Sequence, residues 1–171
     1  MDYATLIEER HSIRAYQPTE VEEDKLRSLL HAANRAPSAG NLQAYQIVAV
    51  RSPAVRQALA RAALDQDFVA QAPVVLVFLA DPGRARGKYG HRGETLYSLQ
   101  DATIACAYAQ LAAHDLGLVS CWVGAFRKDA VREAVGSPPE HVPVALLPLG
   151  YPAEQPRITP RRSLSDLVRR I

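Results

Sequence analysis

The sequence is poor in aromatic residues and carries little net charge. Aromatic side chains make up 6% of the 171 residues, and the formal net charge is only +2. Proteins that bind single-stranded nucleic acid combine a basic groove with aromatic side chains on which bases stack. This chain has no stripe of aromatic residues between basic ones. The composition therefore predicts no nucleic-acid partner.

Cysteine and long apolar runs are also scarce. Cys106 and Cys121 are the only cysteines, too few for a metal cluster or a disulfide framework, so we expect reduced thiols and no bound metal. The longest strongly apolar stretch, APVVLVFLA at residues 72–80, is too short to cross a bilayer as a helix. Acidic residues at positions 2, 8 and 9 do not fit a secretory signal. We expect a cytoplasmic protein without membrane association.

Helical and strand patterns alternate along the chain, but not as a repeated βαβ unit. Predicted helices cover residues 2–10, 19–37, 52–64, 95–117 and 127–135, and predicted strands cover 46–50, 73–80, 118–125 and 142–150. The second helix is expected to begin at Thr19, where TEVE matches a capping box with Glu22. The length suits one domain over residues 1–171. These patterns favour an α+β fold in which helices wrap a sheet.

Residues 81–94, DPGRARGKYGHRGE, form the one long stretch without periodicity. Long irregular segments in compact domains are often functional. We expect a flexible loop here. Its candidate substrate contacts are Lys88, Tyr89, His91 and Arg92, although an exposed polar loop would account for each of them as well.

Two arginines and a serine are spaced two residues apart in EERHSIRAY, residues 8–16. If this segment is extended, Arg10, Ser12 and Arg14 point to one side together. Guanidinium groups and a hydroxyl donate hydrogen bonds suited to phosphate oxygens. The pattern is compatible with one bound phosphate or with a solvated, charged turn.

Three later stretches could reach a flat, charged ligand. In APSAGNLQAY (36–45), turn-forming residues let the backbone approach a ligand, and Asn41 offers both a donor and an acceptor. In GLVSCWVGAF (117–126), Gly124 leaves room for a ring. In TPRRSL (159–164), two arginines could add charge to a phosphate. The alternatives are a helix–strand loop, a strand end with one packed Trp, and a solvated tail.

In their order and spacing these motifs resemble the nitroreductase family of FMN-dependent oxidoreductases. The resemblance is carried by ERHSIRAY, APSAGNLQ, LGLVSCWVGAF after an alanine-rich helix, LPLGYP and RRSL, and it covers essentially the whole chain. It implies a central, mostly antiparallel sheet wrapped by helices. It also implies an intertwined homodimer with two FMN sites at the interface.

The resemblance implies that each FMN site takes residues from both subunits. Those matching the family's phosphate and ribityl contacts are Arg10, His11 (mainly through its backbone), Ser12, Arg14, Arg161 and, less securely, Arg162. Those matching the loop that reaches the flavin from the partner are Pro37, Ser38, Ala39 and Asn41. Those matching the segment along the flavin ring are Val123, Gly124 and Ala125, where a backbone amide can bond to N5, with Gln66 as a further polar contact.

The activity implied by the resemblance is hydride transfer from NADH or NADPH, through FMN, to an electron-poor acceptor such as a nitroaromatic or a quinone. The mechanism would be ping-pong. The sequence shows no nucleophile–base pair, which agrees with chemistry carried by the flavin rather than by a catalytic side chain. Reductive dehalogenation, flavin breakdown, and FMN binding or sensing without catalysis stay open as alternatives.

The helix predicted over residues 95–117 is rich in alanine and apolar on nearly every face. A helix of this kind must be buried all round, and a chain of this size would struggle to cover it. We therefore expect it to hold a second copy together, with Ala105 and Ala109 at the interface. Many family members have a helical insertion over the site, and the 81–94 segment is expected to replace it here.

Overall fold

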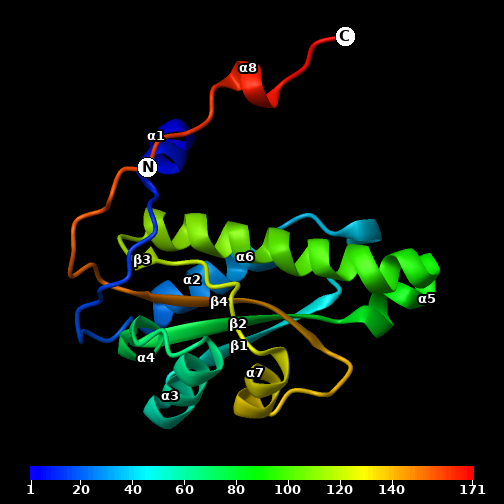
Figure 1. Ribbon diagram of the computed structural model, residues 1–171, viewed down its shortest axis with the longest axis horizontal. Helices are drawn as coiled ribbons and strands as arrows, with labels where there is room; N and C mark the ends of the chain where they lie inside the picture. The colour runs from blue at the N-terminus through cyan, green and yellow to red at the C-terminus, as the bar shows by residue number, and fades with distance from the viewer.

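The computed structural model describes residues 1–171 and has a four-stranded sheet between two layers of helices (Figure 1). The strands are β1 (Tyr45–Val50), β2 (Val74–Ala80), β3 (Val119–Ser120) and β4 (Val142–Gly150). They lie in the order β1-β2-β4-β3, and all neighbouring strands are antiparallel. The α+β architecture with an antiparallel sheet is thereby confirmed.

Eight α-helices and two short helical turns surround the sheet. The helices are α1 (Tyr3–Glu9), α2 (Glu23–Asn34), α3 (Pro53–Ala62), α4 (Phe68–Gln71), α5 (Pro82–Arg92), α6 (Ser98–Asp115), α7 (Lys128–Val135) and α8 (Leu164–Leu167). The turns are the 3-10 turn η1 (Ala39–Asn41) and the π-helical turn η2 (Gly93–Tyr97). None of these helices is long and apolar enough to cross a membrane.

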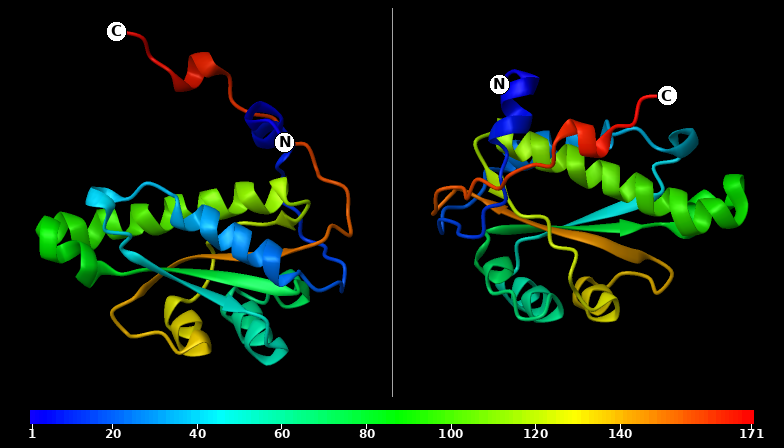
Figure 2. Two further views of the ribbon diagram at one scale, coloured as in Figure 1. Left: turned by 180° about the vertical axis from the view of Figure 1, so that it is seen from behind. Right: turned by 45° about the horizontal axis from the view of Figure 1, so that its top comes forward.

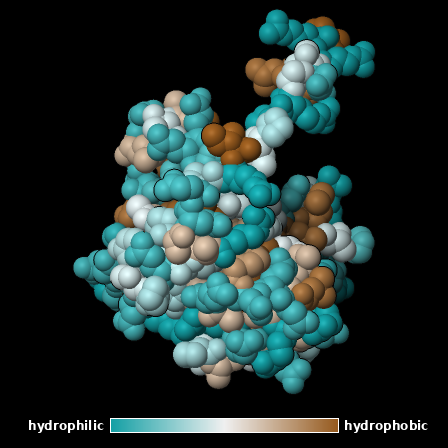
Figure 3. Space-filling view, turned by 60° about the vertical axis from the view of Figure 1, so that its left-hand side comes forward, coloured by the Kyte–Doolittle hydropathy of each residue, from teal (hydrophilic) through white to brown (hydrophobic).

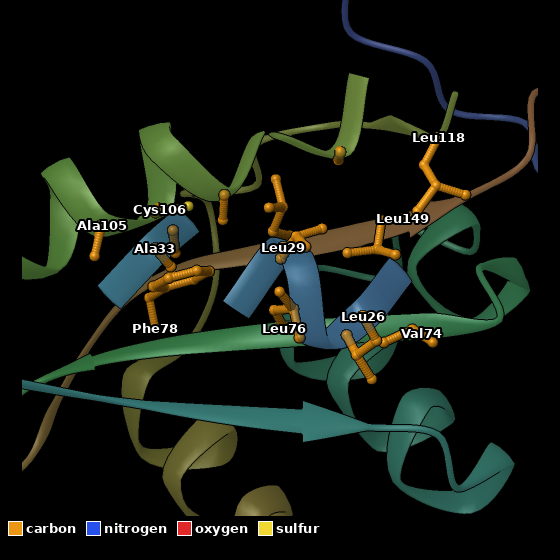
Figure 4. Close-up of a cluster of buried hydrophobic side chains, with 14 of the residues drawn as sticks. Leu26, Leu29, Ala33, Val74, Leu76, Phe78, Ala105, Cys106, Leu118 and Leu149 are labelled. Carbon is orange, nitrogen blue, oxygen red and sulfur yellow. The ribbon is translucent and has the colours of Figure 1, made fainter. Parts of the chain in front are cut away.

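The core lies on both faces of the sheet. Strand β2 is buried along its whole length, as its unbroken apolar sequence predicts. On one face, Leu29 of α2 and Cys106 of α6 belong to the same buried cluster as Phe78 of β2 (Figure 4). On the other face, Leu59 of α3 and Val131 of α7 cover the sheet. The sheet is therefore covered on both faces, and α6 runs across it from the α5 side to the β3 side (Figure 1).

Helix α6 has an inner and an outer face. Ala105 and Ala109 are fully buried and pack in the core cluster of their own chain. The expectation that these two residues contact a second copy is therefore wrong. The exposed side chains of α6 are Gln100, Thr103, Ala107, Tyr108 and Asp115, and Tyr108 is 41% exposed. Because alanine lies on both faces, the sequence alone did not distinguish them.

Residues 81–94 are helical, and the expectation of a flexible loop is wrong. The Asp81 side chain accepts a hydrogen bond from the Arg84 amide (3.0 Å) and caps α5, which has Pro82 in its first turn. The helix kinks at Gly90, where φ is +56°. A side chain at Gly93 would collide with the Ala85 carbonyl, so this glycine lets η2 pack closely on α5. Because the kink interrupts the helical periodicity, the sequence pattern did not indicate a helix here.

Two other predicted boundaries also differ. Helix α2 begins after Glu22 rather than at Thr19, and no side chain caps it. The Glu22 carboxylate instead accepts a hydrogen bond from the Tyr151 hydroxyl (2.8 Å). The strand expected over 118–125 is regular only at β3. Beyond it, Val123 pairs with Leu146 of β4 in a single bridge. The remaining predicted elements are present with shifted ends.

The C-terminal segment leaves the body of the molecule. Every residue from 152 to 171 is exposed, and α8 projects past α1 (Figure 2). Hydrophobic side chains occur on this projecting segment (Figure 3), among them Leu164, which is 76% exposed, and Val168, which is 56% exposed. The rest of the chain therefore does not cover these hydrophobic side chains.

Candidate functional site

The arginine–serine motif is extended where it leaves α1. Arg10 follows the helix with φ −65° and ψ 112°, and Ser12 bridges to Ser120 of β3. Ile13 is buried, and its amide donates to the Ser120 carbonyl (3.2 Å). Because side chains alternate along an extended segment, Ile13 fixes Ser12 and Arg14 on the opposite, exposed side. This is the alternation that the sequence predicts.

Arg10 and Arg161 approach each other from opposite ends of the chain. Burial, followed by the charge of Arg161, lowers the pKa of Arg10 below its ordinary value. The structure gives neither residue, nor Arg14, an ion-pair partner. The Glu154 carboxylate accepts a hydrogen bond from the Arg14 backbone amide (2.6 Å) and pairs with none of the three guanidinium groups, so the cations repel one another. Such an arrangement is stabilised by an anion.

Cys121 lies at the base of this cluster and is 2% exposed. Burial raises the pKa of its thiol, while Arg14, Arg10 and a hydrogen bond with Ser12 act in the opposite direction. The thiol therefore lies within the electrostatic influence of Arg10 and Arg14, while its Sγ donates to the Trp122 carbonyl (3.7 Å). No sequence pattern marked this position, because a single cysteine after a short strand belongs to no motif.

The segment after β3 continues directly from Cys121. The Gln66 side-chain amide donates to the carbonyl oxygens of Ala63 (2.8 Å) and Ala125 (3.4 Å). Val123 is buried, whereas Gly124 and Ala125 are exposed. A methyl group on Gly124 would meet only the Trp122 indole. We call the group Arg10, Ser12, Arg14, Cys121, Gly124, Ala125 and Arg161 the arginine half-site.

Residues 37–43 form a second, separate feature, which we call the loop half-site. Its backbone has positive φ at Gly40, Asn41 and Gln43, a conformation that costs energy at the two non-glycine positions. The Ser38 hydroxyl accepts from the Gln43 amide (3.0 Å), and the Gln43 side chain donates to the Asn41 carbonyl (2.8 Å). These hydrogen bonds hold the strained loop in one shape.

Asp101 of α6 anchors the loop half-site. Its carboxylate accepts hydrogen bonds from the amides of Ala39 (2.8 Å) and Ala44 (3.2 Å), and the residue is 2% exposed. Sequence reasoning missed this residue. The available signal was that Asp101 is the only acidic residue between positions 95 and 114 of an otherwise apolar helix.

A hollow of about 540 Å³ opens beside the loop half-site. Its lining residues are Pro37, Ser38, Ala39, Tyr97, Leu99, Gln100, Asp101, Thr103 and Ile104. Most of this lining belongs to the first two turns of α6 and to the loop itself. The hollow is large enough for part of a flat organic ligand.

Helix α5 packs directly against the loop half-site. Arg84 donates to the Leu42 carbonyl. A methyl group built on Gly40 would clash with the Tyr89 hydroxyl and with Lys88 Nζ. Arg92 donates to the Tyr97 hydroxyl (3.0 Å) at the edge of the hollow. His91 instead lies near Glu94, in a different hollow, away from the other three predicted contacts.

The two half-sites lie at opposite ends of α6. Asp101, in the first turn, holds the loop half-site, while β3 and the arginine half-site follow the last turn (Figure 1). With 18 residues, α6 is about 27 Å long. One chain therefore does not bring all the predicted FMN contacts together. Arg162 also lies apart, because it donates to the Asp166 carbonyl (2.9 Å) at α8.

Comparisons with known proteins agree with this architecture. The family model described as "Nitroreductase family" matches residues 7–66 and 60–151. A protein named NADH dehydrogenase from Thermus thermophilus is 35% identical, over 98% of this chain and 95% of its own length. The FMN reductase (NADPH) of Bacillus subtilis is 30% identical, over 88% of this chain and 66% of its own length.

Solved structures extend the comparison to the fold. NfrA2 of B. megaterium has a TM-score of 0.91 at 28% identity, and the match covers 99% of this chain and 74% of that one. The NADPH:FMN oxidoreductase of Vibrio harveyi, solved with NAD+, has a TM-score of 0.89 at 26% identity, and the match covers 98% of this chain and 76% of that one. Because the family model spans most of the chain and the fold agrees along its whole length, this protein belongs to the nitroreductase family.

Proposed function

We propose that this protein is an FMN-dependent oxidoreductase that passes hydride from NADH or NADPH to an electron-poor acceptor, such as a nitroaromatic or a quinone, in two successive half-reactions. The observation that carries the proposal is the arginine half-site, where the guanidinium groups of Arg10, Arg14 and Arg161 have no ion-pair partner and lie beside small, exposed residues. Relatives named FMN reductase (NADPH) and Oxygen-insensitive NADPH nitroreductase support it.

The residues present suit FMN. A phosphate would neutralise the repulsion between Arg10 and Arg161 and accept hydrogen bonds from their guanidinium groups and from Ser12. Gly124 and Ala125 leave the backbone open to a flat ring, and Gln66 holds the Ala125 carbonyl from behind. His11 would contribute through its backbone, and Val123 fixes the segment by its bridge to β4.

A pair of chains would complete the site. If α6 packs antiparallel against α6 of a second copy, the loop half-site of one chain comes next to the arginine half-site of the other. Twofold symmetry then produces two equivalent sites. The outward face of α6, with Tyr108 and Ala107, is the surface available for this contact. We propose a homodimer with FMN at the interface, in which Pro37, Ser38, Ala39 and Asn41 approach the ring from the partner chain.

In such a site the protein supplies positioning and electrostatics. Bound FMN supplies the hydride-accepting and hydride-donating ring. The arginine half-site fixes the phosphate end, and the loop half-site limits the space on the opposite side. Asp101 keeps the Ala39 amide in place, so that the loop meets the ligand in one geometry. No side chain of the described site needs to act as a nucleophile.

The test begins with purified protein reconstituted with FMN. Bound flavin should co-elute with the protein, and addition of NADH or NADPH under anaerobic conditions should bleach its visible absorbance. A later addition of a quinone should restore the oxidised spectrum. Flavin that binds but stays oxidised with both donors would contradict the reductase and favour a binding protein. Failure to bind FMN would contradict both.

A further inference from the structure

The backbone of the arginine motif is paired with the segment that follows β4. Residues 14–17 lie antiparallel to residues 151–154 (Figure 2). The Gln17 amide donates to the Tyr151 carbonyl (2.9 Å) at one end of this pairing. The start of the C-terminal segment is therefore fixed beside the motif, and Arg161 comes from that same segment.

One peptide group of the motif, between Ile13 and Arg14, is held from both sides. Its carbonyl accepts a hydrogen bond from the Tyr16 hydroxyl (2.8 Å), and its amide donates to the Glu154 carboxylate (2.6 Å). No backbone amide donates to this carbonyl. Because the peptide is planar and not cis, its C=O and N–H bonds point in opposite directions. The two contacts therefore fix the rotation of the whole peptide plane.

Tyr16 is itself attached firmly to the sheet. The residue is buried, and its hydroxyl also lies 3.2 Å from the carbonyl oxygen of Pro148 in β4. A methyl group built on Gly150 would lie 3.4 Å from the Tyr16 ring, so the ring packs closely on the end of that strand. Burial raises the pKa of the Tyr16 hydroxyl, which therefore keeps its proton and remains a donor near neutral pH.

The orientation of this peptide sets the direction in which the Arg14 side chain leaves the backbone. The neighbouring Ser12 is fixed in the same way, because the Ile13 amide donates to the Ser120 carbonyl (3.2 Å). The Arg14 guanidinium has no ion-pair partner and lies 6.0 Å from the centre of the Phe68 ring. A fixed backbone thus carries a head group that is available to an anion, which is the arrangement that lowers the entropic cost of binding.

We propose that Tyr16 and Glu154 are positioning residues for the phosphate of FMN, because they hold the Ile13–Arg14 peptide in the orientation that directs Arg14 and Ser12 at this anion. The inference rests on the proposed function, since it concerns the cofactor of that same site. Neither residue has to touch the flavin. Tyr16 acts from the sheet, and Glu154 acts from the C-terminal segment.

Glu154 has two opposing effects in this role. Its oxygen accepts the Arg14 amide and so orients the motif, whereas its negative charge repels a phosphate bound nearby. A glutamine keeps an acceptor oxygen without the charge, and an alanine has neither. Comparison of these two variants therefore isolates the hydrogen bond, because both lack the charge.

The first experiment compares FMN with riboflavin, which has the same ring and ribityl chain but no phosphate. Fluorescence titration of the full chain gives a dissociation constant for each flavin. Tyr16→Phe should weaken FMN binding by about tenfold, the equivalent of one charge-assisted phosphate contact, and should leave riboflavin binding nearly unchanged. Tyr45→Phe is the matched control. Its hydroxyl also donates to a backbone carbonyl, that of Ala33 (3.2 Å), but outside the arginine half-site. It should keep the wild-type ratio of the two constants.

The second experiment measures the same constants for Glu154→Gln and Glu154→Ala. Glu154→Gln should bind FMN at least as tightly as the wild type. Glu154→Ala should bind FMN about threefold more weakly than Glu154→Gln, as expected for the loss of one exposed hydrogen bond. Thermal unfolding without flavin identifies any variant that is not folded, and if Tyr16→Phe is one of these, the two Glu154 variants decide the question.

A folded Tyr16→Phe variant that keeps the wild-type ratio, including one that binds both flavins equally more weakly, would overturn the proposal. Equal FMN affinities of Glu154→Gln and Glu154→Ala would also overturn it. In both cases a wild-type protein whose FMN is reduced by NADH or NADPH leaves the proposed function intact. A wild-type protein that binds riboflavin as tightly as FMN would instead refute the phosphate site, and one that binds neither flavin would refute the function itself.

Discussion

The carboxylate of Asp101 and the amide of Ala39 are joined by a hydrogen bond of 2.8 Å, although 62 positions separate them in the sequence. The second oxygen accepts from Ala44, so one buried side chain fixes both ends of the strained segment. A carboxylate suits this position because it accepts on both oxygens, whereas a carboxamide accepts on only one.

Asp101→Asn should weaken both the fold and FMN binding. One of the two amides would face an NH₂ group, and an unsatisfied buried donor costs about 1–3 kcal/mol. We expect a loss of this size in the free energy of unfolding, measured with urea, and a higher dissociation constant for FMN. Asp115→Asn, at the exposed end of the same helix, is the matched control because its surface ion pair contributes little. A variant with wild-type stability and affinity would show that Asp101 does not hold the loop.

Arg10→Ala and Arg161→Ala should each raise the dissociation constant for FMN by about tenfold or more. A charge-assisted hydrogen bond to phosphate contributes about 1.5–3 kcal/mol. Without flavin, Arg10→Ala should change the melting temperature little, because it also removes the repulsion from Arg161. Fluorescence titration of FMN and thermal unfolding of the apo-protein measure the two effects.

Arg162→Ala is the internal control for the same experiment. Its guanidinium donates to the Asp166 carbonyl rather than joining the arginine half-site. We expect a clearly smaller effect on FMN affinity than at Arg161, its neighbour in sequence. Equal effects at both positions would mean that the tail binds the phosphate in another arrangement.

Charges on the outer face of α6 should prevent pairing of chains. Ala107→Glu and Tyr108→Lys place a charge where we propose that a second copy packs, and both wild-type side chains are exposed in the single chain. We expect monomers that have lost FMN, detected by light scattering combined with flavin absorbance. Glu133→Lys on α7 should remain dimeric and yellow. A monomeric Tyr108→Lys variant that retains flavin would refute a site shared between two chains.

Neither cysteine should react with a thiol reagent in the folded protein near neutral pH. Cys106 is fully buried, Cys121 is 2% exposed, and burial raises the pKa of both thiols. A raised pKa means that less of the reactive thiolate is present at a given pH, so any labelling should accelerate as the pH increases. Mass spectrometry after alkylation, with and without denaturant, counts the labelled thiols. Rapid native labelling of Cys121 would show that the arginine half-site opens.

Features that depend on the local pattern of residues could be predicted from the amino-acid sequence. The unbroken apolar run of β2 indicated a strand covered on both faces, and it is buried throughout. The two-residue spacing of Arg10, Ser12 and Arg14 predicted that their side chains share one side if the segment is extended, and Ile13 is the buried residue between Ser12 and Arg14. Such features follow from the repeat of side-chain direction along the backbone, which neighbouring residues define.

Features that depend on contacts between residues distant in the sequence became apparent from the three-dimensional structure alone. Arg161 lies near Arg10, the Asp101 carboxylate accepts a hydrogen bond from the Ala39 amide, and Ala105 packs in the core. Each of these contacts joins segments that are far apart in the sequence, so no local periodicity predicts it. Helix α5 was not predicted from the sequence, because the kink at Gly90 breaks its helical periodicity. Its position is set by packing on Gly40. The separation of the two half-sites arises from the length and straightness of α6. It is a geometric fact that the residue types alone do not encode.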